Sequence, residues 1–101
     1  MRKVNLNRTQ ILEGAYEYPE DLIKLKYTNH VTGRLAQRGI GIECIPSLVR
    51  VTKDNVYCGK TEDNKTLCSV VVRLKYTSKR NLFLCFNPRD GGLKTLWFKE
   101  K

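Results

Sequence analysis

The clearest pattern of hydrophobic and polar positions lies between Cys68 and Pro88. Apolar and polar residues alternate over positions 70–77, and an apolar face returns over positions 82–86 after the polar turn at 78–81. An alternation of period 2 is typical of a half-buried strand, because successive side chains point to opposite faces of a sheet. The pattern predicts an antiparallel hairpin whose cationic side chains lie on the solvated face and at the tip.

Other segments predict shorter elements around this hairpin. Asn7 and Gln10 have the spacing of a capping box, which favours a brief helix from Asn7 to Glu13. Three glycines within residues 29–41 favour an irregular loop. We expect strands over 22–28 and 48–52, a hydrophilic loop over 59–67, and a final strand or short C-terminal helix over 93–100.

These elements predict a small, mainly β or α+β fold built on an antiparallel sheet. A chain of 101 residues has the length of one domain, so we assign residues 1–101 to a single domain and expect residues 1–21 to form a mobile N-terminal segment. With 41% apolar residues, the chain can bury a core. No stretch approaches the roughly 18 consecutive apolar residues of a membrane span, so we expect none.

The charge of the chain indicates a polyanionic partner. Nineteen basic residues stand against ten acidic ones, which gives a net charge of +9. Glycosaminoglycan, nucleic acid or anionic lipid would each satisfy this charge, and solubility alone is the simpler alternative. Arginine binds sulfate or phosphate through two hydrogen bonds, whereas lysine acts as a point charge. The candidate polyanion-binding residues are Arg73, Lys75, Lys79 and Arg80.

Four cysteines are many for a chain of this length. They are Cys44, Cys58, Cys68 and Cys85, and their spacing matches no zinc signature. An even number in a small basic domain predicts two disulfides that staple the fold in an oxidising compartment, with the pairing left open. The first residues lack the apolar core of a signal peptide, so the chain is either a mature secreted form or cytosolic. We expect secretion, or a cytosolic protein if the cysteines are free.

Residues outside the hairpin indicate modification rather than catalysis. Asn7 and Asn64 begin N-x-T sequons and are candidate glycosylation sites of a secreted protein. Tyr16 and Tyr18 lie among carboxylates, where they either pack against the domain or undergo sulfation. His30 has no nucleophile or acid partner in a motif, and the glycines form no phosphate-binding fingerprint. We therefore expect no enzymatic activity, no cofactor and no metal.

The segments IPSLVRVTKDNVYC and VVVRLKYTSKRNLFLCFNP together resemble the three-stranded core of a chemokine, an interleukin-8-like small cytokine. In this resemblance Cys58 and Cys85 match the third and fourth cysteines of the family, and Asn87-Pro88 match the element after the fourth. It implies a secreted protein that binds a cell-surface receptor or a cytokine-system partner together with sulfated glycosaminoglycan. It also implies a C-terminal helix, whose packing face would consist of Leu93, Leu96, Trp97 and Phe98.

Other functions remain open from the same residues. The segment KYTSKRNLFLCFNPRDGGL is similar to a repeat of the fibroblast growth factors, which implies a heparin-binding trefoil. A decoy that binds host cytokines or receptors without signalling would have the same features. A cytosolic nucleic-acid-binding protein is the alternative from a different class, because aromatic residues on basic strands provide stacking surfaces. Its candidate stacking residues are Tyr27, Tyr76, Phe83 and Trp97.

Overall fold

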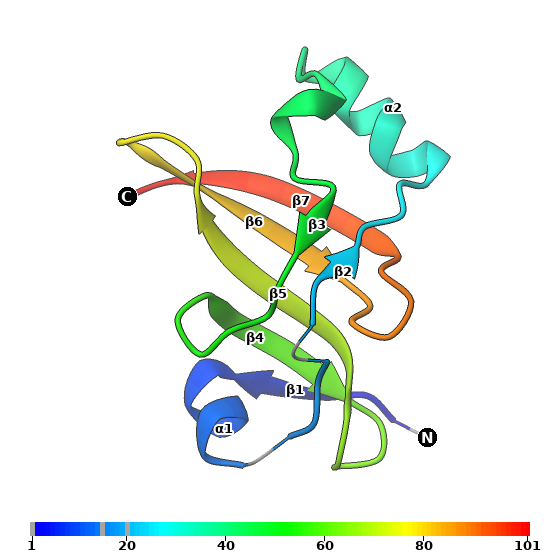
Figure 1. Cartoon of the computed structure of the whole chain (residues 1–101), viewed down its shortest axis with the longest axis vertical. Helices are drawn as coiled ribbons and strands as arrows, with labels where there is room; N and C mark the ends of the chain where they lie inside the picture. Colours follow the sequence, from blue (N-terminus) through cyan, green and yellow to red (C-terminus); the bar gives the residue numbers. More distant parts are fainter. Residues whose placement is uncertain (1, 15, 20) are drawn as a thin grey trace.

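The structure, a computed structural model, describes residues 2–14, 16–19 and 21–101. A five-stranded antiparallel sheet with the strand order β1-β4-β5-β6-β7 forms most of the molecule (Figure 1). This confirms the expectation of a mainly β fold with an antiparallel sheet. The strands of this sheet are β1 (Val4–Asn7), β4 (Val56–Thr61), β5 (Leu67–Lys75), β6 (Arg80–Phe86) and β7 (Leu93–Glu100). The remaining elements are α1 (Arg8–Glu13), β2 (Ile23–Lys24), α2 (Asn29–Gln37), the 3₁₀ helix η1 (Ile42–Cys44) and β3 (Leu48–Val49).

The expected central hairpin is formed by β5 and β6. Val70 lies opposite Phe86, and the pairing continues without a shift to Lys75 opposite Asn81. At the tip, the carbonyl of Arg80 accepts hydrogen bonds from the N–H groups of Tyr76 and Thr77. The hydroxyl of Thr77 in turn accepts a hydrogen bond from the N–H of Arg80. The turn is therefore closed from both sides, as the polar sequence there predicts.

The C-terminal segment is a strand, which corrects the helix implied by the chemokine resemblance. The three-residue spacing of Leu93 and Leu96 looks helical, but a β-bulge between Cys85 and Phe86 allows both leucines to face the core from β7. The preceding turn contains Gly91 at φ 79, a left-handed conformation that glycine adopts readily. A Cβ at Gly91 would also collide with the carbonyl oxygen of Lys24, so this turn packs tightly on β2.

The loop expected over residues 59–67 is shorter in the structure, because β4 continues to Thr61 and β5 begins at Leu67. The carboxylate of Asp63 organises the tight turn between them by accepting hydrogen bonds from the N–H groups of Lys65 and Thr66. These donors hold the pKa of Asp63 well below its usual value. Asn64 occupies the left-handed region at φ 61, which asparagine tolerates better than most residues.

The segment before β4 differs most from expectation. Residues 22–28 and 48–52 contain only the two-residue strands β2 and β3, which pair with each other. Residues 29–37, expected as loop, form helix α2. The side chain of Thr28 caps it by accepting a hydrogen bond from the N–H of Val31. Val31 and Leu35, four residues apart, are both buried, and this packing outweighs the helix-weakening effect of Gly33.

Helix α1 begins as expected. The side chain of Asn7 accepts a hydrogen bond from the N–H of Gln10, and the side chain of Gln10 accepts one from the N–H of Asn7, which together form a capping box. The preceding strand β1 pairs with β4 at the edge of the sheet. The predicted mobility of the N-terminal segment stays a prediction.

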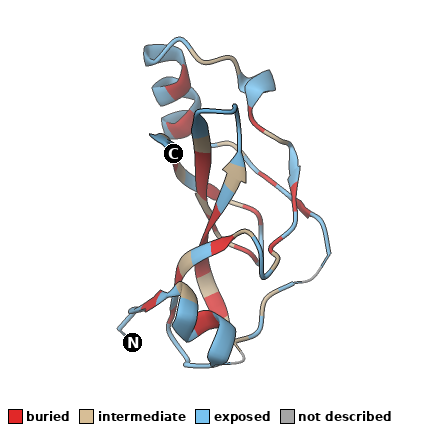
Figure 2. Ribbon diagram, turned by 90° about the vertical axis from the view of Figure 1, so that its left-hand side faces the viewer, coloured by how far each residue is buried: buried red, intermediate tan, exposed pale blue. Residues whose placement is uncertain are grey.

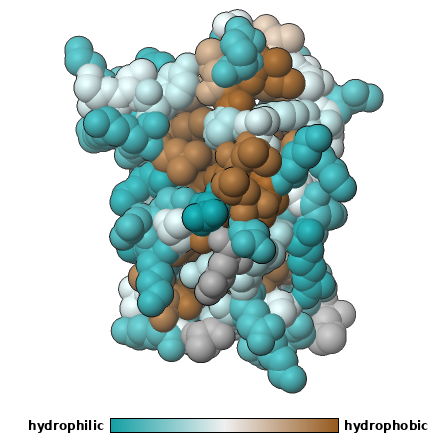
Figure 3. Space-filling view, viewed as in Figure 1, coloured by the Kyte–Doolittle hydropathy of each residue, from teal (hydrophilic) through white to brown (hydrophobic). Residues whose placement is uncertain are grey.

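One face of the sheet carries the hydrophobic core, and we call it the inner face. Val70, Val72, Leu84 and Phe86 are each 0% exposed there. The buried residues of α1, α2, β2 and β3 join the same cluster, so all these elements cover this face (Figures 1 and 2). Figure 3 shows the covered side, where apolar atoms gather at the centre and hydrophilic residues surround them.

The four cysteines lie in the described part of the chain, and each is a free thiol. The expected disulfide-stapled fold is therefore corrected. The strand register gives the reason for Cys58 and Cys85: both lie opposite Val71, on the strands to either side of it. Two strand spacings separate their Cα atoms by about 10 Å. A disulfide requires less than about 7 Å.

Candidate functional site

The face of the sheet opposite the core, which we call the outer face, carries the candidate site. Within residues 2–14, 16–19 and 21–101, no helix packs on it, because the elements outside the sheet bury their apolar side chains on the inner face. The strand register groups the outward-pointing side chains into rows that cross the sheet. The rows consist of Lys75, Asn81 and Lys99, then Arg73, Phe83 and Trp97, then Cys58, Val71, Cys85 and Thr95.

An aromatic row, defined as Tyr57, Phe83 and Trp97, lies at the centre of this face. The rings of Phe83 and Trp97 are stacked, with centroids 5.3 Å apart and planes 3° from parallel. Tyr57 meets Phe83 edge to face at 5.0 Å. Phe83 is only 3% exposed between its neighbours, whereas Tyr57 is 40% exposed. Because β7 is the edge strand of the sheet, the side of the indole ring that faces away from Phe83 is not covered by a further strand in the described structure.

Cations adjoin the aromatic row. Arg73 is the direct cross-strand partner of Phe83, and Lys75 and Lys99 flank Asn81 in the next row. All three cations are exposed. A hollow of about 200 Å³ joins the two rows, and three cations and one carboxylate line it together with the aromatic rings: Tyr57, Arg73, Asn81, Phe83, Lys99, Glu100 and Lys101. The exposed cations of the outer face thus lie in the aromatic row or in the next row, which is about 7 Å away along the strands.

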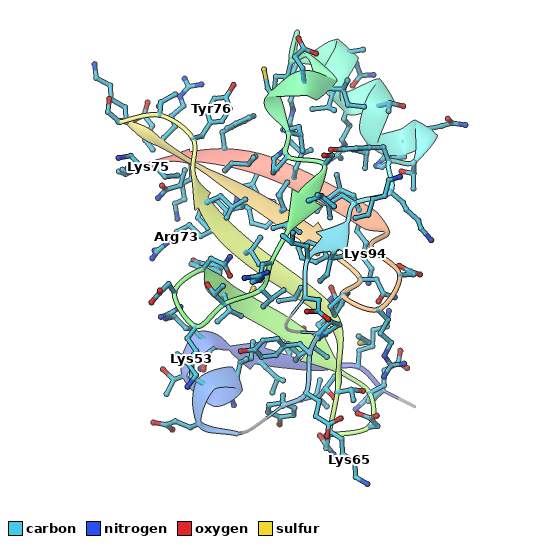
Figure 4. All side chains as sticks on the ribbon, in the orientation of Figure 1. Lys53, Lys65, Arg73, Lys75, Tyr76 and Lys94 are labelled. Carbon is cyan, nitrogen blue, oxygen red and sulfur yellow. The ribbon has the colours of Figure 1, made fainter. Side chains whose placement is uncertain are left out.

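Two of the four predicted polyanion-binding residues lie on this face, and the other two lie at the tip of the hairpin. Arg73 and Lys75 are alternate residues of β5, and the side chains of both point to the outer face (Figure 4). Lys79 and Arg80 lie at the tip of the β5–β6 hairpin and are exposed there. The tip lies next to the outer face, because Lys101, which lines the hollow on that face, donates a backbone hydrogen bond to the carbonyl of Lys79.

The predicted stacking residues separate into two groups. Phe83 and Trp97 come together, but Tyr76 packs against Phe98, whose partner Leu82 faces the core. Tyr27 also lies on the core side, where its hydroxyl donates a hydrogen bond to the carbonyl of Pro46. Sequence reasoning missed Tyr57, Lys99 and Lys101. The alternation provides a signal for this face, because Phe83 is a large aromatic residue at a position of β6 that points away from the core.

The remaining candidate residues lie elsewhere. The Asn7 side chain is engaged as the cap of α1, and Asn64 is exposed in the β4–β5 turn. Tyr16 and Tyr18 are half-buried and pack against the core cluster, which is the first of the two alternatives that the sequence left open for them. His30 is exposed on α2. Among the residues that the structure describes, no group of histidine, cysteine and carboxylate side chains could hold a metal ion.

A thiol pair lies next to the aromatic row. Cys58 and Cys85 flank Val71, and burial raises the pKa of the Cys58 thiol above its ordinary value, with the neighbouring Cys85 adding to the effect. The Cys58 side chain is therefore a neutral thiol at neutral pH. It contributes polarisable, weakly hydrogen-bonding surface to the outer face rather than charge.

No protein-family model, curated protein or solved structure matches the chain. The resemblances to chemokines and fibroblast growth factors therefore stay predictions. No helix in the described ranges is long and apolar enough to cross a membrane.

Proposed function

We propose that the protein binds single-stranded nucleic acid on the outer face of its sheet. The observation that carries the proposal is the parallel stack of Phe83 and Trp97 beside Arg73, on a face that the rest of the described fold leaves uncovered. Aromatic rings that stack on unpaired bases, combined with cations that track the phosphates, are the usual elements of such binding. The proposal develops the alternative from the sequence that invoked Phe83 and Trp97.

In this proposal, the aromatic row binds a base and the cations beside it bind phosphates. A base continues the aromatic stack on the free side of Trp97, because Phe83 covers only the other side of the indole. The guanidinium of Arg73 and the ammonium groups of Lys75 and Lys99 neutralise phosphates. Unpaired bases are required, because a paired base inside a duplex does not offer its ring face to a side chain.

Glycosaminoglycan binding by a secreted, cytokine-like protein is the competing proposal. It uses the same cations, but sulfated sugars gain less than nucleobases from a stacked aromatic pair. Free thiols in all four cysteines also remove the disulfide argument that favoured an extracellular protein. The aromatic row therefore supports nucleic acid over glycan, and an experiment that weighs aromatic against cationic contributions separates them.

Trp97 is the only tryptophan of the chain, so its fluorescence reports directly on this face. We expect oligothymidylate or oligouridylate of about 12 nucleotides to quench Trp97, and heparin of similar charge to quench it less. Trp97→Ala should weaken oligonucleotide binding about 5- to 150-fold, measured by anisotropy of a labelled strand, because base stacking contributes about 1–3 kcal/mol. Trp97→Phe, which keeps a ring, should restore most of the affinity.

Salt dependence provides the second readout. Lys99→Gln should reduce the slope of log K against log salt by about 0.7, the value for one phosphate contact on a single strand. Lys65→Gln is the matched control, because Lys65 lies in the β4–β5 turn at the opposite end of the molecule (Figure 4). Strong heparin binding that is insensitive to Trp97→Ala would overturn the nucleic-acid proposal in favour of the glycan.

A further inference from the structure

A second hollow lies on the outer face, in the next row of the sheet after the aromatic row. It encloses about 140 Å³, and its walls include Cys58, Ser69, Val71 and Cys85, with Asn5 and Lys60 at its border with β1. We call it the thiol hollow. Val71 and Cys85 form the outward-facing pair that follows Arg73 and Phe83, so the two hollows of this face are about 7 Å apart along the strands.

The chemistry of the thiol hollow is that of a site for a flat, mostly apolar ring with a polar edge. Val71 and the thiols of Cys58 and Cys85 supply apolar, polarisable walls. Ser69 is only 3% exposed, yet the hydrogen-bond partner of its hydroxyl in the described structure is the thiol of Cys85, 3.5 Å away. Sulfur is a weak donor and acceptor, so this buried hydroxyl retains capacity for a stronger partner.

Charge at the hollow indicates which ring-bearing ligand fits. Lys60 lies opposite Ser69 on β4 and is exposed, so it places an ammonium group at the border of the site. Asn5 lies opposite Lys60 on β1 and adds an amide. An apolar slot with a hydroxyl inside and a cation at the border suits a nucleobase attached to a phosphate.

We propose that the thiol hollow holds one nucleobase of the strand that stacks on Trp97, with the hydroxyl of Ser69 bonded to the base edge and Lys60 paired with its phosphate. This inference rests on the proposed function, because it assigns a second contact to the same bound strand. It adds that the protein contacts bases at separate points on the outer face and that hydrogen bonding, not stacking alone, contributes to selection among bases.

The free cysteines allow a direct test in the unmodified protein. Trypsin places each cysteine on its own peptide, in GIGIECIPSLVR, DNVYCGK, TLCSVVVR and NLFLCFNPR, so alkylation of each can be followed by mass spectrometry. With oligothymidylate at ten times its Kd, the alkylation rates of Cys58 and Cys85 should fall about tenfold. Cys44 is the internal control, because it is exposed in η1, whose flanking residues Ile40 and Ile45 pack with the core cluster on the inner face.

An abasic strand of the same length separates base insertion from simple coverage by the backbone. Protection by oligothymidylate but not by the abasic strand, with Trp97 quenched, supports the inference. Equal protection by both strands, or unchanged rates while Trp97 is quenched, overturns the thiol hollow as a base site and leaves the proposed function standing. If Trp97 is not quenched and no strand binds, the proposed function itself fails.

Ser69→Ala supplies a second measurement, since it removes one oxygen and keeps the rest of the wall. The loss of one hydrogen bond should weaken oligothymidylate binding about three- to tenfold and leave binding of the abasic strand unchanged. Equal affinities of Ser69→Ala and the original protein for oligothymidylate would contradict the assigned role of the hydroxyl.

Discussion

The two faces of the five-stranded sheet are made from the same strands, yet they differ in what their side chains do. On the inner face, aliphatic residues and Phe86 are fully buried beneath α1, α2 and the β2–β3 pair. On the outer face, Val71 and Phe83 are also buried, and Phe83 packs between Tyr57 and Trp97 of the same sheet. The inner face therefore holds the fold together, while the outer face exposes aromatic, cationic and thiol groups side by side.

Because of this difference, consecutive residues of one strand lie on different faces and have different surroundings. Leu84 and Cys85 are consecutive in β6, but Leu84 is 0% exposed on the inner face and Cys85 is half-buried on the outer face. The aromatic residues of the outer face differ in burial, because Phe83 is only 3% exposed whereas Tyr57 is 40% exposed. The exposed part of this row, and not the buried Phe83, is what the proposed binding uses.

The largest expected effect tests the inner face. Leu84→Ala should lower the free energy of unfolding by about 2–5 kcal/mol, because it leaves a cavity in the packed core. Cys85→Ala, one residue away, should lower it by less than about 1 kcal/mol, since its side chain is smaller and partly exposed. Urea unfolding followed by circular dichroism measures both values. Similar losses for the two variants would show that the outer face is as much a core as the inner one.

A smaller effect tests the outer face with a matched pair of tyrosines. Tyr57 and Tyr76 are 40% and 38% exposed, and each contacts a phenylalanine, but Tyr57 lies on the outer face and Tyr76 on the other side of the sheet. Tyr57→Ala should weaken oligothymidylate binding about tenfold, and Tyr76→Ala by less than twofold. Equal losses, measured by anisotropy at one salt concentration, would mean that binding is not confined to the outer face.

The smallest effect concerns the protonation of Cys58. Because burial raises its pKa in the folded protein, the thiol should react with an alkylating reagent only at higher pH than the same residue in urea. The folded state favours the protonated thiol, so this contribution to stability is present below the ordinary pKa of 9.0 and is lost as pH rises above it. A pH–rate profile of the DNVYCGK peptide checks the shift. Coincident profiles in the folded protein and in urea would show that the thiol is fully solvated.

The central hairpin was predictable because its information is local. Alternation over residues 70–86 gives the pairing of β5 with β6, and it separates Leu84, which faces the core, from Phe83, which does not. The capping box of α1 was predictable for the same reason, since Asn7 and Gln10 are three residues apart. Helix α2 was missed because glycines concealed the spacing of Val31 and Leu35, although the cap at Thr28 was present in the sequence.

The candidate site depends on contacts that are remote in sequence. Tyr57 meets Phe83 only because β4, β5 and β6 are neighbours and because a bulge between Val56 and Cys58 shifts the register. No local pattern reports that bulge. The expectation of two disulfides was wrong for a related reason: sequence spacing does not say whether two thiols lie on adjacent strands, and Cys58 and Cys85 lie on strands separated by β5.

The edge position of β1 has a consequence for how the chain acquires its shape. Strands β4 to β7 follow one another as consecutive hairpins, but Leu6 of β1 lies opposite Gly59, about half the length of the chain away. Closing so long a loop costs more conformational entropy than closing a hairpin, so we expect the meander to assemble before β1 docks. We therefore expect β1, although it is synthesised before β4 to β7, to join the sheet after them. Until it arrives, β4 presents an unpaired edge to which a second nascent chain could add its own strand.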